Sequence, residues 1–258
     1  MTRQPEPLRH VALTRYIEPL REGGSLPALA EADDGFRYAV KFRGAGHGAK
    51  MLVAELIGSE IARAAGLRVP ELVLVDVDED FGRTEGDEEI QDLLRASQGL
   101  NLGLHYLAGT FTWDTLVNDT DALTASKVVW LDAFLTNIDR TVRNTNMLAW
   151  RRELWLIDHG ASLYFHHSWS DWKKAALSAF PYVKDHAFIR CASMLDEADA
   201  LMHEALTPQI LDAIVDLVPD EWLDNPESRD VYRQFLHTRL ANSKIFVDHA
   251  KSVRATLV

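Results

Sequence analysis

Short apolar runs separated by turn residues dominate the first part of the chain and predict β-strands. In one of these runs every second residue from Phe36 to Phe42 is apolar, so Lys41 faces the other side of the strand. The predicted strands cover residues 14–20, 26–32, 36–42, 67–76 and 99–107. The first 107 residues are therefore expected to be rich in β-structure.

Apolar positions at spacings of three and four predict helices in the rest of the chain. One helix interrupts the strands at residues 50–65 and ends at Gly66. Its apolar stripe contains Glu55, whereas Glu60 lies about 140° round the helix and is expected to be solvated. The other predicted helices cover residues 90–96, 124–136, 194–203, 208–217, 219–222 and 230–250.

Two four-residue apolar runs, 147–150 and 154–157, flank the polar residues 151–153 and predict a β-hairpin with a three-residue loop. In an antiparallel pair, residues whose numbers have the same sum face each other. This register places Met147 opposite Ile157 and Asn146 opposite Asp158, at the open end of the hairpin.

Oxygen-bearing side chains lie at three places around this hairpin. Asp139 lies in the loop before it, Asn144 and Asn146 precede its first strand, and Asp158 follows its second. Carboxylate and amide oxygens suit Mg²⁺, which takes few protein ligands together with substrate phosphates. The same order of groups performs phosphoryl transfer in protein kinases. Taken singly, Asp139 beside Arg140 is also compatible with a surface ion pair, and Asp158 with an ordinary turn.

The sequence resembles the HipA-like kinases in Asn-x-Asp-Arg at 137–140, Asn-Thr-Asn at 144–146 and Ile-Asp-His-Gly at 157–160. The resemblance extends over residues 14 to 165. It implies that Asp139 positions the acceptor hydroxyl, and that Asp158 binds Mg²⁺ together with Asn144 or Asn146. The usual kinase spacing favours Asn144, and the expected hairpin register favours Asn146.

The resemblance also assigns residues that contact the nucleotide. Tyr-Ala-Val-Lys at 38–41 resembles the Val-Ala-Ile-Lys of a kinase strand, whose lysine reaches the phosphates. Glu55 is then the expected partner of Lys41. The run Leu104, His105, Tyr106 and Leu107 falls where kinases bind adenine through the backbone. The turn at Gly23, Gly24 and Ser25 allows backbone N–H groups to approach a phosphate, although it is equally consistent with a plain hairpin turn.

The composition narrows the class of protein. The formal net charge of −12 opposes general attraction to nucleic acid, and no apolar run approaches the 18 residues of a membrane helix. We therefore expect neither nucleic-acid nor membrane binding, and a cytoplasmic location. The single cysteine, Cys191, excludes an internal disulfide and is expected to be buried or half-buried.

These observations together predict an α+β protein with a bilobed protein kinase-like fold. Residues 1–107 would form a β-rich nucleotide-binding lobe, and residues 108–258 a helical catalytic lobe. The expected activity is ATP- and Mg²⁺-dependent transfer of a phosphoryl group to a serine or threonine hydroxyl, as the resemblance implies. The partners are then the nucleotide and a protein or small-molecule acceptor. A small-molecule kinase and a catalytically silent nucleotide-binding module remain as alternatives.

Overall fold

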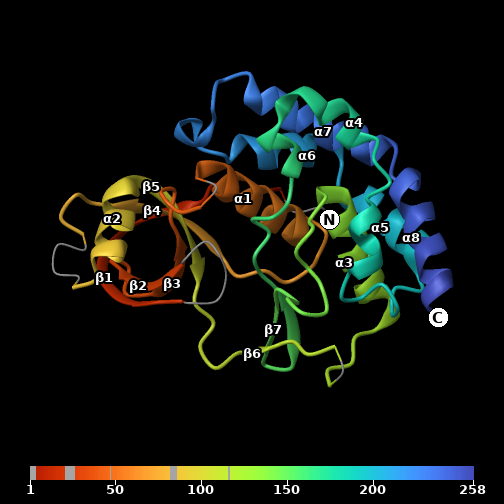
Figure 1. Ribbon diagram of the computed structural model, residues 1–258, viewed down its shortest axis with the longest axis horizontal. Helices are drawn as coiled ribbons and strands as arrows, with labels where there is room; N and C mark the ends of the chain where they lie inside the picture. Colours follow the sequence, from red (N-terminus) through yellow and green to blue (C-terminus); the bar gives the residue numbers. More distant parts are fainter. Residues whose placement is uncertain (1–3, 21–26, 47, 82–85, 116) are drawn as a thin grey trace.

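The structure is a computed structural model of residues 1–258, and it describes all of them except 1–3, 21–26, 47, 82–85 and 116. A barrel of strands lies at one end of the molecule and a group of helices at the other (Figure 1). Helix α1, Ala49–Ala64, runs between them. The predicted combination of strands and helices is therefore confirmed.

Five strands close the barrel in the order β1-β2-β3-β5-β4. Most neighbours are antiparallel, but β1 runs parallel to β4 and closes the barrel. This pairing begins at Arg9 opposite Val73, which explains why β1 starts before the predicted residue 14. The strands are β1, Arg9–Pro19; β2, Ala28–Ala32; β3, Arg37–Lys41; β4, Leu72–Val77; and β5, Gly99–His105.

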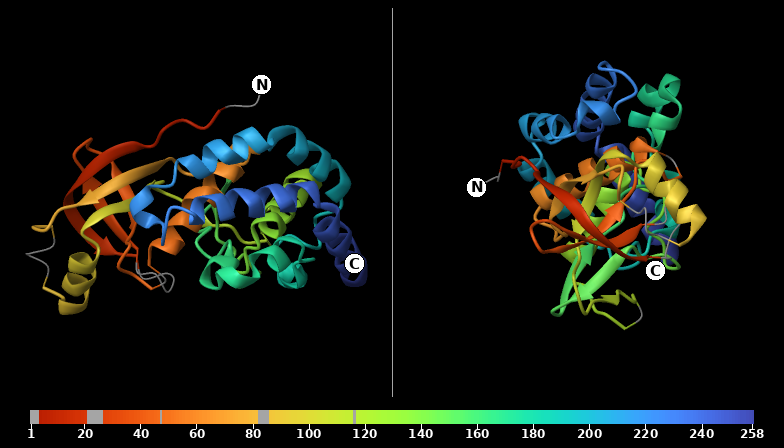
Figure 2. Two further views of the ribbon diagram at one scale, coloured as in Figure 1. Left: turned by 90° about the horizontal axis from the view of Figure 1, so that it is seen from above. Right: turned by 90° about the vertical axis from the view of Figure 1, so that its left-hand side faces the viewer.

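Helix α1 is buried from Met51 to Ala62 because the barrel covers one side and the C-terminal helices cover the other (Figure 2). A helix buried on all sides belongs to the core of a protein. The expectation that Glu60 is solvated was wrong. Its side chain is buried, with an oxygen 3.2 Å from Arg63 Nε, because residues 4–9 and the start of β4 lie against this face of the helix.

The helices after residue 120 share one apolar core with α1, whereas the helix Glu88–Ala96 packs Leu94 into the core of the barrel. The predicted helix at 230–250 is two helices, because the chain turns at Asn242 and Ser243 with no proline or glycine to mark the break. No helix in the described part of the chain is long and apolar enough to cross a membrane. The helices are α2, Glu88–Ala96; α3, Ala122–Leu135; α4, Trp172–Ala176; α5, Leu195–Ala205; α6, Pro208–Asp216; α7, Ser228–Ala241; and α8, Lys244–Leu257.

A small sheet of three strands stands apart from the barrel: β6, Phe111–Thr112; β7, Met147–Trp150; and β8, Glu153–Leu156. The β7–β8 hairpin exists, but its predicted register was wrong by one residue. Arg151 and Arg152, with φ of 51° and 68°, form a two-residue turn, so Glu153 pairs with Trp150 in the strand. The amide of Ile157 consequently donates to the carbonyl of Asn146, and Asn146 does not face Asp158.

Cys191 was expected to be at least half-buried, and this was wrong. It lies in the turn Phe188–Cys191 and is exposed, because its neighbours Phe188 and Ala192 fill the core instead.

Gly58 allows α1 to approach the turn after β8 closely. A Cβ atom at this position would lie 2.6 Å from the Cβ of His159, closer than two carbons can pack. We predict that Gly58→Ala lowers the free energy of unfolding by about 1–3 kcal/mol, the usual cost of overpacking, despite the better helix propensity of alanine. Urea unfolding measures this difference. Gly86→Ala is the control, because a Cβ there meets nothing within 4 Å. Equal stability of the two variants would contradict the close packing.

Candidate active site

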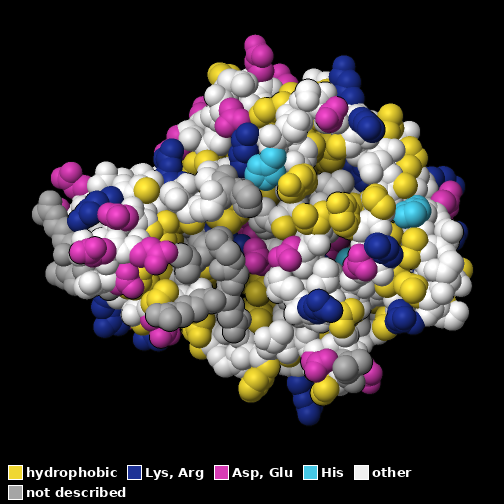
Figure 3. All heavy atoms as spheres, viewed as in Figure 1, with side chains coloured by type: hydrophobic (Ala, Val, Ile, Leu, Met, Phe, Trp, Pro, Cys, Tyr) yellow, Lys and Arg dark blue, Asp and Glu magenta, His cyan; other side chains and the backbone are white. Residues whose placement is uncertain are grey.

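The predicted site residues that the structure describes gather around one cleft of about 840 Å³ between the barrel and the β7–β8 hairpin. Figure 3 shows acidic side chains near the centre of the face seen in Figure 1. Gly23, Gly24 and Ser25 lie outside the described residues. Glu55 lies directly behind Lys41 and does not line the cleft. The predicted residues that line it are Lys41, Leu104, His105, Tyr106, Leu107, Asp139, Asn144, Asn146 and Asp158.

Lys41, at the end of β3, is a buried cation held between two carboxylates. Its Nζ lies 2.7 Å from Glu55 Oε2 and 2.5 Å from Asp158 Oδ1. Burial lowers the pKa of Lys41, but the charges of Asp158 and Glu55 outweigh it and leave the pKa above the ordinary value. The lysine is therefore charged and joins the barrel, α1 and the end of the hairpin.

The two carboxylates differ in their surroundings. Glu55 is fully buried, and burial raises its pKa although Lys41 opposes the shift. Asp158 reaches the cleft with a side chain that is 34% exposed, and the charge of Lys41 lowers its pKa. Asp158 therefore stays ionised and accessible to a ligand, whereas Glu55 pairs with Lys41 in the protein interior.

Asp139 lies in the loop after α3 and is fixed on both sides. Its backbone N–H donates to Asn137 Oδ1 at 3.1 Å, and its Oδ2 accepts hydrogen bonds from Asn144 Nδ2 at 2.8 Å and Asn146 Nδ2 at 3.0 Å. Both asparagines predicted as metal ligands thus reach the same oxygen. Their Oδ1 atoms stay available as acceptors.

A buried network beneath this loop was missed by the sequence analysis, which gave Arg140 no role. Asp132 Oδ2, inside α3, lies 2.6 Å from Arg140 Nε and 2.9 Å from His186 Nε2. Its Oδ1 accepts from Asn137 Nδ2 at 2.9 Å. Burial by itself would raise the pKa of Asp132. The effects of Arg140 and His186 are larger and bring the pKa below its ordinary value, so the carboxylate is ionised. The signal available in the sequence was a single acid in an apolar run, between Leu131 and Ala133.

Arg140 also closes the open end of the β7–β8 hairpin. Its Nη1 donates to the carbonyl oxygens of Asn146 and Ile157. The residue is 1% exposed, so its guanidinium holds the loop of Asp139 and both strand ends in one geometry. A single buried side chain therefore fixes the backbone next to Asp139, Asn146 and Asp158.

His159 follows Asp158 and turns into the core. Its Nδ1 lies 3.2 Å from Ser59 Oγ of α1, and the residue is completely buried. Burial, with the nearby charge of Arg140, lowers the pKa of His159 to about 3, so the imidazole is neutral at pH 7. Gly160 comes next, where a Cβ would meet Met51 Cγ at 2.8 Å. The Asp-His-Gly turn is thus packed against α1 along its length.

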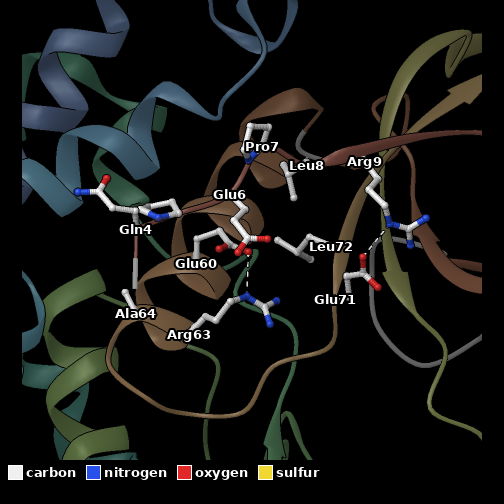
Figure 4. A pocket seen from close by; sticks show the side chains of 11 residues that line it. Gln4, Glu6, Pro7, Leu8, Arg9, Glu60, Arg63, Ala64, Glu71 and Leu72 are labelled. Carbon is white, nitrogen blue, oxygen red and sulfur yellow. Dashed lines mark hydrogen bonds and ion pairs between the residues drawn. The ribbon is translucent and has the colours of Figure 1, made fainter. Parts of the chain in front are cut away.

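A second cavity of about 300 Å³ lies on another face of α1 (Figure 4). Glu60, Arg63 and Ala64 of α1 line it together with residues 4–9 and the start of β4. The Nη1 and Nη2 atoms of Arg63 donate hydrogen bonds to the carbonyl oxygens of Val69 and Pro70. This cavity shares no lining residue with the cleft and contains none of the described residues predicted to be functional.

Comparisons with known proteins agree with this geometry. The family model described as HipA-like kinase matches residues 13–246, so this chain is a kinase-type phosphotransferase. It belongs to the HipA-like kinase family. No curated protein sequence matches it.

Two solved structures are similar to this chain over nearly its whole length. The crystal structure of a Helicobacter pylori proinflammatory kinase, CtkA, is similar with a TM-score of 0.59 at 15% identity, covering 98% of this chain and 100% of that one. The Golgi casein kinase gives a TM-score of 0.47 at 10% identity, covering 97% and 76%. The similarity to CtkA shows that the fold is protein kinase-like, as the sequence predicted.

The buried pair of Arg140 and Asp132 yields a stability prediction. We expect Arg140→Met to lower the free energy of unfolding by about 3 kcal/mol or more, because Asp132 keeps a buried charge without its main partner. Denaturant unfolding measures the loss. Arg95→Met is the matched control, since Arg95 pairs with Asp92 on the exposed face of α2 and should contribute less than about 1 kcal/mol. A loss below about 1 kcal/mol in Arg140→Met would contradict the structural role.

Proposed function

We propose that this protein transfers the γ-phosphoryl group of ATP to a serine or threonine hydroxyl of a protein substrate. The observation that supports it best is Lys41, whose Nζ lies between the buried Glu55 and the cleft-facing Asp158. A charged amine at the floor of a cleft is suited to bind a polyphosphate. Glu55 keeps this amine charged and oriented when a ligand changes the surroundings of Asp158.

Mg²⁺ fits the side chains at the mouth of the cleft. Asp158 offers a carboxylate with a lowered pKa, and Asn144 or Asn146 offers an amide oxygen. Such a set of few, hard oxygen ligands suits Mg²⁺ shared with phosphate groups. When bound, the ion would neutralise negative charge on the phosphates.

Asp139 is proposed to orient the acceptor hydroxyl and to accept its proton. Its Oδ2 already accepts two amide hydrogen bonds, which hold the carboxylate in one orientation and leave Oδ1 for the acceptor. Positioning contributes much of the rate in phosphoryl transfer, since the transition state needs the attacking and leaving oxygens in line.

The adenine is proposed to bind beside residues 104–107, between apolar side chains such as Ala39, Leu148 and Ile157. The amides of His105 and Tyr106 already donate to the carbonyls of Glu71 and Arg37, at 2.8 and 2.9 Å. The carbonyl groups of this run and the N–H of Leu107 are therefore the proposed partners of the base. In this proposal residues 1–107 and 108–258 act as two lobes around the nucleotide.

Incubation with Mg²⁺ and ATP labelled on the γ-phosphate tests the activity. We predict label on a protein, and a loss of about 10²- to 10⁴-fold in Asp139→Asn, because the amide cannot accept the proton. Asp196→Asn, an exposed acid of α5 that pairs with Lys251, is the control and should retain activity. Label confined to an added metabolite, or nucleotide-dependent melting without turnover in the wild type, would refute the proposed protein kinase.

The two asparagines can be separated by their Mg²⁺ dependence. The expected hairpin register was the reason to favour Asn146, and the observed register removes it. Asn146 is also the more buried of the two, and its backbone carbonyl accepts a hydrogen bond from Arg140. We predict that Asn144→Ala raises the Mg²⁺ concentration for half-maximal activity about tenfold or more. Asn146→Ala should instead lower kcat with little change in this concentration. The opposite pattern would assign the metal to Asn146.

A further inference from the structure

The connection between α6 and α7 makes contacts that the proposed reaction does not use. Residues 219–225, here called the 219–225 bridge, leave the helical part of the molecule and reach the barrel and the start of α1 (Figures 1 and 2). Trp222 anchors it: the side chain is 2% exposed, and its Nε1 donates to the carbonyl of Leu100 in β5 at 2.9 Å. Glu221 adds an ion pair with Arg43 at 2.6 Å.

Asp224, in the same bridge, joins two elements that flank the cleft. Its Oδ2 lies 2.9 Å from Lys50 Nζ, in the first turn of α1, and accepts a hydrogen bond from Trp169 Nε1 at 3.0 Å. Lys50 Nζ also lies 5.3 Å from the centre of the Trp169 ring. The three side chains therefore form a closed set of contacts, and the hydrogen bond from Lys50 lowers the pKa of Asp224.

Trp169 belongs to the segment that follows the Asp-His-Gly turn. Helix α7 packs against this segment. Phe165 stacks on Phe235 with ring centres 4.1 Å apart, and His166 Nδ1 lies 2.9 Å from the hydroxyl of Tyr232. Trp169 in turn packs against the Tyr232 ring. The indole is thus a fixed point to which Asp224 can tie α1.

We propose that Asp224 is a positioning residue for the phosphotransfer reaction. It holds Lys50 against the fixed Trp169 and so sets the start of α1, which carries Glu55 about 1.4 turns further on. Glu55 then meets Lys41 in the orientation that the phosphates need. The inference rests on the proposed function, and it states that a carboxylate of the chain itself holds α1 in place.

Steady-state kinetics of four proteins test the inference: wild type, Lys50→Met, Asp224→Asn and the double variant. We expect each single change to lower kcat about three- to tenfold with KM for ATP changed less than twofold, because a displaced Glu55 misplaces Lys41 in the bound complex. The double variant should be no slower than the slower single variant, since both changes break one interaction. Additive losses, or losses below twofold in both single variants, would overturn the proposal.

The matched control is another lysine–aspartate pair, Lys251 and Asp196, which joins α8 to α5 at 2.5 Å, away from the cleft. Lys251→Met should keep kcat within twofold. A loss in this variant as large as in Lys50→Met would show a general effect of losing surface charge and would also overturn the proposal.

Amide hydrogen exchange gives a readout that does not need activity. In Asp224→Asn we expect exchange about fivefold faster or more in residues 49–57 and 164–171, with the other helices unchanged. Unchanged exchange in these two segments, or faster exchange spread evenly over the chain, contradicts the proposal. If the wild type transfers no phosphoryl group, the proposed function fails, and the exchange result alone decides whether Asp224 sets α1.

Discussion

The arrangement of the cleft depends on one buried cation. An ammonium group removed from water is costly unless carboxylates surround it, so Lys41 can be charged at the end of β3 only while Glu55 and Asp158 both approach it. Those two acids come from α1 and from the turn after β8. The requirement to pair one amine therefore joins the barrel, α1 and the hairpin, and it brings together residues that are 117 positions apart.

A second buried pair, Asp132 with Arg140, fixes the other side of the cleft. Arg140 is bound to the carbonyls at both ends of the hairpin, so the position of Asp158 depends on it as well as on Lys41. Of the charges in the two clusters, those of Arg140 and Lys41 oppose protonation of a group between them, whereas those of Asp132 and Asp158 favour it. His159, which lies there, is neutral because burial and Arg140 lower its pKa to about 3. The interior thus contains two ion clusters separated by an uncharged imidazole.

Local patterns predicted much of this architecture, and the failures have identifiable causes. The period of two placed Lys41 on the face opposite the apolar residues of β3, and the helical stripe selected Glu55 over Glu60 as the partner of Lys41. The hairpin register failed because two arginines adopt a turn in which glycine and asparagine are usual, which left polar Glu153 in a strand. The pairing of Asp132 with Arg140 and His186 was beyond local patterns, since it depends on how distant segments pack.

The position of Glu55 relative to Lys41 is well defined because α1 is anchored on both sides of Glu55. Gly58 and Ser59 fit against His159 with no room for a side chain at position 58, which fixes the later part of the helix. Lys50, bound to Asp224, holds its first turn. These anchors are about 12 Å apart at 1.5 Å per residue. Because a helix bends little over two turns, fixing both points leaves the carboxylate between them little freedom to move relative to Lys41. Loosening either anchor would allow α1 to tilt about the other, which carries Glu55 away from the amine while the rest of the core remains packed.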